Sequence, residues 1–373
     1  DMHAMIPPEY DVILIGAGLA NTALVLSLLE TNYKGKVLLL EKESYFPVER
    51  TWCFWRKDLL PYYLHKLISA QWFSWISSHK GHYTKQVCTD SNYAYACING
   101  HDYYHFCESE FSKANSVTVM FNQNIKDISD NQSEFSVMHG DTHTTATYVL
   151  DSRPNQGKKT SAGFYQSFTG ARVRSHLPIF NPQEVHLMSN LEVLDNDTLC
   201  FQYVLPFSSH EALIEYTCFS VVVPDYDVLR KHTLFELSKR WHLNDQNILQ
   251  WEQGCLPMFT QPLEKLLTGK NYSPSGIASG NIRSATGYAF LINHRWAKKA
   301  ANAIVNGQSL IGINGYSKFY KWIDKLFLNV IQDDLNAAPS LFIDLMKYTS
   351  AESFARFMTE TASPADMLAI ISA

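Results

Sequence analysis

Glu215 is the side chain of this sequence with the clearest capacity for acid chemistry. It stands alone as a carboxylate in an apolar, β-prone run, Ala212–Ser220. A carboxyl group buried among such residues is poorly solvated when it is charged, so its pKa rises and it stays able to donate a proton. An outward-facing residue on an edge strand would fit the same pattern. The run alone therefore predicts either a buried proton donor or a solvent-facing carboxylate.

A second group of residues, near the start of the chain, has the spacing of a dinucleotide-binding turn. The apolar run Val12–Ile15 leads into a Gly-x-Gly turn and then into the apolar segment 22–29, which predicts strand, tight turn and helix. Glycines here let backbone N–H groups approach a pyrophosphate, and the helix dipole favours its charge. Asn21 replaces the third glycine of the fingerprint, so helix and strand should approach slightly less closely. The residues expected at the cofactor are Gly16, Gly18, Leu19, Ala20 and Asn21.

The next apolar run, Val37–Leu40, ends in Glu41 and Lys42. Glu41 lies roughly where a βαβ unit places the acid that binds the ribose, so this opening unit is predicted to bind an ADP moiety. A glycine-containing turn without any ligand is the alternative. The loop that follows, Ser44–Trp55, is rich in aromatic residues beside Arg50. In a flavoprotein such a loop would lie along the cofactor, whereas in other proteins it would be a surface loop with its aromatic residues tucked beneath it.

Two later segments have the pattern of chain that returns to a flavin. The predicted strand Thr144–Leu150 ends at Asp151 and turn residues. The segment 275–288 combines a short strand with glycine-rich turns, including Gly280 and Gly287, before a predicted helix over 289–306. In two-dinucleotide-domain flavoproteins the backbone there packs against the ribityl chain and the isoalloxazine.

Composition limits the classes of protein. With 373 residues the chain should form two or three lobes, and 46 % hydrophobic against 18 % charged residues is normal for a globular enzyme. The net charge of −5, without a basic block, argues against a nucleic-acid partner. Seven cysteines without a CxxC pattern indicate buried thiols in a reducing compartment, and the 14 histidines show no metal spacing. No metal site is predicted; His101 and His105 are read as a solvated or satisfied pair.

The remaining elements are predicted more coarsely. Residues 56–100 are expected to be irregular, and 102–113 to be helical. The strands expected downstream include three in a meander (117–121, 135–139 and 144–150) and four in a second sheet (163–170, 199–205, 212–220 and 251–257). Residues 235–241 belong to a helix, and from about Tyr316 onward the chain should be helical. Ser363, Pro364 and Asp366 form an N-cap signature.

Nine short motifs in this order resemble the bacterial lycopene β-cyclases, carotenoid cyclases among the FAD-dependent flavoproteins. The resemblance runs from about Tyr10 to the end of the chain. The motifs are Gly16–Asn21, Thr51-Trp-x-Phe54, Asp151-x-Arg153, Gly163-Phe164 with Gly170, Tyr203–Pro206, Leu213–Glu215, Glu252-x-Gly254, Leu256–Met258 and Thr286–Tyr288. That family itself carries asparagine at the position of Asn21.

The resemblance implies an α/β fold of the monooxygenase and reductase superfamily: an FAD-binding Rossmann-like domain, an inserted β-sheet substrate lobe and a helical C-terminal segment. The expected boundaries are 9–56, 101–160 and 270–312 for the FAD domain, 57–100 and 161–269 for the lobe, and 313–373 for the helical region. It also implies Glu215 as the catalytic acid. Thr51, Trp52, Thr286, Gly287 and Tyr288 would lie near the flavin.

The implied reaction is a cyclisation of a linear carotenoid without net redox change. A ψ-end of lycopene is protonated, a nearby double bond attacks the carbocation, and loss of a proton gives a β-ionone ring. FAD would act in its reduced form, with NAD(P)H needed only to reduce it. Such a reaction requires an acid in a dry pocket and aromatic faces or an anionic flavin beside the cation.

The sequence departs from the family pattern at three places. Tyr216 stands where a second acid commonly follows the glutamate, Ser284 and Ala285 replace His-Pro after Arg283, and Pro154 replaces a glycine. Another isoprenoid or polyene substrate therefore stays open.

Other function classes stay open as well. An FAD-dependent hydroxylase, epoxidase or halogenase would usually carry a Gly-Asp motif, and no Gly-Asp-Ala occurs in this sequence. A prenyl reductase would consume NADPH stoichiometrically, and a carotenoid-binding protein would have no need of Glu215. Because no apolar run is long enough to span a bilayer and no signal peptide precedes the first strand, we expect a cytoplasmic, peripherally membrane-associated protein. The contact would be made by the aromatic 56–76 region or the C-terminal helices.

Overall fold

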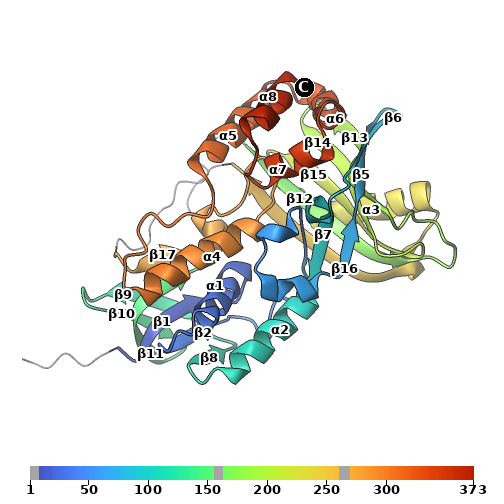
Figure 1. Cartoon of the computed structure of the whole chain (residues 1–373). Coiled ribbons are helices and arrows are strands. Elements are labelled where there is room, and N and C mark those ends of the chain that lie inside the picture. The colour runs from blue at the N-terminus through green and yellow to red at the C-terminus, as the bar shows by residue number, and fades with distance from the viewer. Residues whose placement is uncertain (1–7, 155–162, 260–268) are drawn as a thin grey trace, which may run out of the picture.

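The computed structural model describes residues 8–154, 163–259 and 269–373 (Figure 1). Its first sheet has the strand order β8-β2-β1-β11-β10-β9, with β17 beside β11. β8, β2, β1, β11 and β17 are parallel neighbours, and β9 and β10 add an antiparallel meander to β11. The bounds are β1 Tyr10–Ile15, β2 Val37–Leu40, β8 Val117–Met120, β9 Ile125–Asp130, β10 Phe135–His139, β11 Thr142–Asp151 and β17 Tyr272–Pro274.

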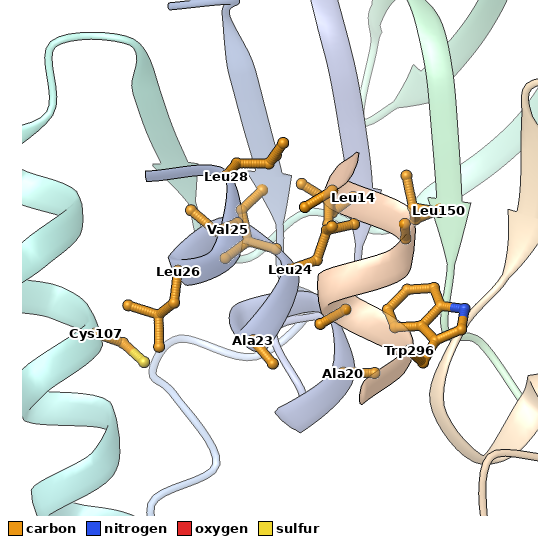
Figure 2. Close-up of a cluster of buried hydrophobic side chains, with 14 of the residues drawn as sticks. Leu14, Ala20, Ala23, Leu24, Val25, Leu26, Leu28, Cys107, Leu150 and Trp296 are labelled. Atoms are coloured by element: carbon orange, nitrogen blue, oxygen red, sulfur yellow. The ribbon is translucent and has the colours of Figure 1, made fainter. Parts of the chain in front are cut away.

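Helix α1 (Leu19–Glu30) lies between this sheet and two further helices, α2 (Gly100–Lys113) and α4 (Phe290–Val305). Figure 2 shows Leu24 of α1 beside Leu14 of β1, with Leu150 and Trp296 close by, while Leu26 points toward Cys107 of α2. Because helices cover α1 on its outer side, it is apolar all round rather than on one stripe. This packing fixes the first turn of α1 against the end of β1.

The second sheet has the order β16-β12-β15-β14-β13-β5-β6 and forms the inserted lobe. A third, small sheet has the order β3-β7-β4, and in the chain its strands alternate with strands of the two larger sheets. The lobe strands are β5 Ser74–His79, β6 His82–Val87, β12 Phe164–Arg174, β13 Glu184–Leu194, β14 Thr198–Pro206, β15 Glu211–Ser220 and β16 Ile248–Met258. The small sheet consists of β3 Thr51–Phe54, β4 Ala70–Trp72 and β7 Tyr95–Asn99.

Helices cover both faces of the lobe sheet. On one face α3 (Tyr226–Trp241) packs across β12 and β15. On the other, α5 (Lys318–Asp333) contributes Leu328 and Ile331 to a core with Phe201 and Phe219. The other C-terminal helices are α6 Ala338–Lys347, α7 Ala351–Met358 and α8 Pro364–Ser372. The capping box expected at α8 is present, because Ser363 accepts from the Asp366 N–H and Asp366 from the Ser363 N–H.

Three expectations from the sequence are wrong. Residues 56–100 are not irregular, because they hold β4 to β7 and three short 3₁₀ turns, Lys57–Leu59, Tyr62–Leu67 and Ser91–Tyr93. Residues 51–54, expected in a loop, form β3. The strand at 117–120 pairs in parallel with β2 and does not belong to the meander. The expected domain boundary at 160/161 lies outside the described residues, and the one at 269/270 adjoins the undescribed segment 260–268.

No described helix has the length and apolar character needed to cross a bilayer. Within the described ranges, no three His, Cys, Asp or Glu side chains are grouped so that they could hold a metal ion. All seven cysteines are free thiols, five buried and two partly buried.

Candidate active site

The first turn of α1 leaves its N-terminus open to a ligand. Gly16 has φ +90°, and a Cβ there would lie 2.1 Å from the Ser152 Oγ, so only glycine fits. Gly18 is the N-cap residue of α1, and no side chain caps its backbone N–H groups. A Cβ at Gly18 would meet nothing within 4 Å. Unpaired N–H groups and the helix dipole at an open helix start suit a phosphate.

Asn21 stabilises this turn by hydrogen bonds. It is fully buried, and its Nδ2 donates to the carbonyl oxygens of Ile15 and Gly16 at 2.9 and 2.8 Å. The residue in the place of the third glycine therefore ties helix α1 to the end of β1 through hydrogen bonds rather than through close backbone contact.

Glu41 lies at the end of β2 beside the same turn. It is buried, and its carboxylate accepts from the Ala17 and Glu43 N–H groups at 2.7 and 3.0 Å. Lys42 is exposed, with Glu43 3.6 Å away. The structure thus brings Glu41 to the glycine turn, as expected for a ribose-binding acid, while Lys42 points into solvent.

The segment around Gly280 packs against the other side of the glycine turn. A Cβ at Gly276 would lie 3.6 Å from the Ala20 Cβ, and Gly280 has φ +75°. Three buried side-chain atoms on these segments have no hydrogen-bond partner among the described residues: Asn21 Oδ1, Ser275 Oγ and Asn281 Nδ2. Buried polar atoms are rarely left unpaired, so they fit a bound group rich in hydroxyl and phosphate oxygens. The residues present therefore fit a dinucleotide such as FAD.

Arg50 and Thr51 border a cavity of about 200 Å³ between the small sheet and the lobe sheet. The same cavity is bordered by Asn99, Asp102, Arg172 and Glu252. Trp52 packs edge-on against Tyr103, with ring centroids 5.1 Å apart, and also contacts Phe290. The loop from Glu41 thus leads directly from the glycine turn to the lobe sheet.

Asp151, which the sequence predicts at the cofactor, uses its carboxylate for contacts within the protein. It is 2 % exposed, forms an ion pair with Arg153 at 2.8 Å and accepts from the Tyr272 hydroxyl at 2.9 Å. Its carboxylate joins β11 to β17, while its backbone lies beside the turn that contains Gly16.

The Thr286–Tyr288 turn contacts the lobe sheet. Gly287 has φ +78°, and a Cβ there would lie 2.8 Å from the Gln166 Oε1 and 3.2 Å from the Leu256 Cδ1. Gln166 Oε1 is another buried acceptor without a described partner. Backbone therefore approaches β12 and β16 at the point where the sequence predicts contact with the flavin.

Glu215 lies on β15 and meets a second glutamate, Glu252 of β16. Both are paired in register with Gly170 of the central strand β12. A Cβ at position 170 would lie 2.8 Å from the Glu215 Cγ and 3.1 Å from the Glu252 Cγ. Because strands two apart are separated by nearly 10 Å, the side chains can meet only across a residue without a side chain. Gly170 therefore allows the two carboxyl groups to form a pair.

The environment of this pair keeps Glu215 protonated. Burial of the carboxyl group raises the pKa of Glu215 well above its usual value, and the hydrogen bond and charge of Glu252 raise it further. Glu215 is partly buried and stands on an interior strand of the sheet, between β12 and β14. Of the two interpretations that the sequence left open, the structure therefore favours the proton donor over the solvent-facing edge residue. Glu252 lines the cavity and lies 3.5 Å from the Thr51 Oγ1.

Three tyrosines adjoin the glutamate pair. The Tyr95 hydroxyl lies 2.6 Å from that of Tyr203 and 2.7 Å from that of Tyr288. Tyr203 is paired in register with Glu215. Burial raises the pKa of Tyr95, Tyr203 and Tyr288 above the usual value, so all three stay neutral. The site thus offers one proton donor among neutral hydroxyls and aromatic rings, an arrangement suited to protonating an apolar substrate.

Two of the three departures from the family pattern lie away from this site. Tyr216 is on the opposite face of the lobe sheet, where its ring stacks on His232 of α3 with centroids 5.3 Å apart. Pro154 is exposed. The third departure, Ser284 and Ala285, is buried, and Ala285 packs with Phe201 and Phe219 on the face of the lobe sheet that carries Glu215. Arg283, which precedes them, is 1 % exposed and forms an ion pair with Asp324 of α5 at 2.7 Å. None of the three lines the cavity beside Glu252.

Glu252 is the site residue to which the sequence assigned no role. Its motif, Glu252-x-Gly254, was visible, but its proximity to Glu215 depends on the placement of β12 between β15 and β16. Tyr95 and Tyr203 were likewise not singled out as site residues, because no local spacing links them.

Comparison with known protein families gives one match over nearly the whole chain. The family model described as "Lycopene cyclase protein" matches residues 11–373. The lycopene beta-cyclase of Pantoea ananas is 24 % identical over 293 residues, which cover 76 % of this chain and 71 % of that protein.

Solved structures share the fold at low sequence identity. A flavoprotein/dehydrogenase from Cytophaga hutchinsonii has a TM-score of 0.65 at 10 % identity, covering 97 % of this chain and 99 % of that one. A geranylgeranyl bacteriochlorophyll reductase-like protein from Thermoplasma acidophilum has 0.62 at 12 %, covering 97 % and 96 %. A "probable FAD-dependent monooxygenase" from Pseudomonas aeruginosa has 0.59 at 11 %, covering 98 % and 100 %. The fold is therefore the FAD-binding Rossmann-like type with an inserted sheet and a helical C-terminal region, as expected.

Proposed function

This chain belongs to the lycopene cyclase family, and from that premise we propose that it cyclises an end group of a linear carotenoid, lycopene, to a β-ionone ring without net redox change. The observation that carries the proposal is the Gly170-separated pair of Glu215 and Glu252. An acid held protonated among aromatic rings and neutral hydroxyls is what protonation of an isolated double bond requires.

FAD is the proposed cofactor, held at the open start of α1 and along the segments around Gly280 and Arg50, with NAD(P)H as the reductant that keeps it reduced. Reduced flavin would supply negative charge beside a developing carbocation. The chain's own residues supply the binding surface: uncapped N–H groups for phosphate, Glu41 for ribose, and the Thr286–Tyr288 turn against the lobe sheet.

The proton chemistry belongs to the glutamates. Glu215 transfers its proton to the terminal double bond of the carotenoid end, and the next double bond attacks the cation and closes the ring. A ring proton then leaves to the carboxylate pair, which regenerates the protonated Glu215. Glu252 acts here as a positioning residue, because its hydrogen bond and charge favour the protonated form of Glu215. The rings of Tyr203 and Tyr288 offer π faces to the cation.

A second candidate function is an FAD-dependent oxidoreductase acting on another isoprenoid or polyene. The likeness in fold to the geranylgeranyl bacteriochlorophyll reductase-like protein is the observation that supports it. Such an enzyme would change the mass of its product and consume NAD(P)H in proportion to product, whereas a cyclase would do neither. The proposed location is the cytoplasmic surface of a membrane, where the substrate dissolves.

The test is anaerobic incubation of the purified protein with lycopene, FAD and a reductant, followed by chromatography and mass spectrometry of the pigments. We expect an isomer of unchanged mass, and at least a hundredfold slower conversion by Glu215→Gln, since a positioned general acid contributes about 10²–10⁴-fold. Glu192→Gln, an exposed glutamate of the same sheet, is the matched control and should keep wild-type activity. A product of altered mass, or full activity of Glu215→Gln, would reject the cyclase proposal.

Glu252→Gln distinguishes a positioning role from a merely structural one. Activity needs the protonated Glu215, so it falls as the pH rises through the pKa of that residue. Removing the negative charge of Glu252 lowers that pKa, and the alkaline limb of the activity profile should move to lower pH while bound flavin is unchanged. An unshifted limb would exclude the role assigned to Glu252.

A further inference from the structure

Helix α5 carries an exposed apolar stripe formed by Phe319, Trp322, Leu326 and Val330. The exposed fractions of these side chains are 50 %, 59 %, 49 % and 51 %. Their spacing of three, four and four residues places them on one face of the helix. Tyr320, Asp324, Leu328 and Ile331, on the other face, are buried. Single exposed apolar residues need no explanation, but a stripe along a whole helix does.

The charged side chains of α5 that lie beside the exposed stripe are positive. Lys318, Lys321 and Lys325 lie on the same helix, beside the stripe. Of the two carboxylates of the helix, Asp324 is buried in its ion pair with Arg283, and Asp333 is the last residue. An apolar face bordered by lysines has the character of a helix that lies in the surface of a membrane with anionic lipids.

The inner face of α5 connects this surface to the site. Leu328 and Ile331 pack on Phe201 and Phe219. These two residues share a face of the lobe sheet with Tyr203 and Glu215, because they alternate along β14 and β15 with the residues that face α3. Asp324 ties the helix to the segment that ends in the Thr286–Tyr288 turn. Figure 1 shows α5 at the end of the molecule opposite β1 and β11.

We propose that the stripe of α5 is the surface by which this protein docks on an anionic lipid bilayer, from which its substrate enters. The entry of substrate rests on the proposed function; the docking does not. Trp322 would sit at the level of the headgroups, as tryptophans do at membrane interfaces, and the lysines would contact lipid phosphates. The 56–76 region, the other surface expected from the sequence, is less suited because its exposed apolar residues, Leu59, Tyr62 and Phe73, lie on separate short segments and form no stripe. Its tryptophans, Trp72 and Trp75, are 1 % and 0 % exposed.

The test is sedimentation of the purified full chain with vesicles of phosphatidylcholine, with and without phosphatidylglycerol. We expect binding that increases with the anionic lipid and falls with salt. Trp322→Asp/Leu326→Asp should lose it by more than tenfold, and each of Lys318→Gln and Lys325→Gln should weaken it roughly fivefold. The control is Val222→Asp/Val228→Asp, two exposed apolar residues at the other side of the lobe, which should bind as wild type.

Two results would overturn the proposal. Equal binding by the α5 double variant and wild type would exclude this surface. A wild type that is a dimer in solution and a double variant that is a monomer, with vesicle binding absent from both, would mean that a second copy of the chain covers the stripe. Circular dichroism of each variant establishes that it is folded.

Activity measured with lycopene in micelles and in vesicles distinguishes the docking proposal from the proposed function. The α5 double variant should convert lycopene supplied in detergent micelles at the wild-type rate and fail with lycopene supplied in vesicles. If wild type converts neither, the proposed function is rejected while the vesicle result still decides the docking surface.

Discussion

Gly170 lies between two glutamates that belong to the strands on either side of it. Gly170→Ala would place a methyl group 2.8 Å from the Glu215 Cγ and 3.1 Å from the Glu252 Cγ, so the carboxyl groups must move apart. We expect a loss of about 1–3 kcal/mol of unfolding free energy and a larger loss of activity, with the alkaline limb of the pH profile moved to lower pH. Activity profiles and urea unfolding measure both.

The control for Gly170→Ala is Gly254→Ala, where the added methyl would meet the Phe168 ring at 2.6 Å and neither glutamate. That variant should lose stability to a similar degree and keep the wild-type pH profile. If both variants shift the profile alike, the effect comes from general strain in the sheet and not from the glutamate pair.

His294 of α4 is a buried residue with a clear dependence on pH. Burial lowers its pKa to about 3, and neither ring nitrogen has a described partner. In the unfolded chain this histidine binds a proton below about pH 6.5, whereas in the folded chain it stays neutral. Its contribution to the free energy of unfolding is therefore fully present above that pH and is lost as the pH falls below it. Between pH 7.5 and 5 the loss should be about 2 kcal/mol. Urea unfolding of His294→Leu should lack this part of the slope, and the exposed His105→Leu should retain it.

At the scale of elements, Asp324 determines how α5 is held. Its carboxylate accepts from Arg283 Nε and Nη2 at 2.8 and 2.7 Å and from the Tyr316 hydroxyl. Asp324→Asn should reduce the unfolding free energy by about 3–5 kcal/mol, because it leaves Arg283 as an uncompensated buried charge. Asp333→Asn, on the exposed end of the same helix, should change it by less than about 0.5 kcal/mol. A small effect at Asp324 would show that water reaches the pair.

The elements that the sequence identified correctly are those whose pattern is local. β1, β14 and β15 are apolar, β-branched runs, and α8 begins at a capping box within four residues. The hairpin of β5 and β6 was missed, although Lys80 and Gly81, both with positive φ, connect two runs of alternating residues. Aromatic residues at both exposed and buried positions obscured that alternation.

The residues of the candidate site also fall into those that a local pattern indicates and those that only the fold brings together. The glycine turn and Glu41 were predicted because each occurs in a short pattern, whereas the run around Glu215 left two interpretations and only the family resemblance gave that residue a role. The pairing of Glu215 with Glu252, and the ion pair that explains Arg283, join residues 37 and 41 positions apart through the fold. No periodicity within one segment contains that information.

At the scale of the whole molecule, the C-terminal helices pack against the lobe sheet. Gln86 of β6 is 4 % exposed, donates to the Met346 and Thr349 carbonyl oxygens at 2.9 and 3.0 Å, and accepts from Trp75 Nε1 at 2.7 Å. Gln86→Ala leaves these buried groups unpaired, and we expect a loss of about 3 kcal/mol. Thermal unfolding and limited proteolysis after α5 should both report it.

Gln71→Ala is the control for Gln86→Ala, because Gln71 is exposed and bonds only Lys57 Nζ, at 3.0 Å, among the described residues. It should leave both measurements unchanged. Equal protease resistance of Gln86→Ala and wild type would mean that apolar packing alone holds the C-terminal helices on the lobe.

The contact of Glu215 with Glu252 across Gly170 has a consequence for how related chains can diverge in sequence. Positions 170, 215 and 252 meet at one point, so they are expected to be inherited as a set. A side chain at 170 would crowd Glu215 even where the glutamate at 252 has been lost, so a relative is expected to gain one there only after it has lost both acids. In a comparison of related chains, the residue at 170 should therefore tell which of them still carry the acid pair.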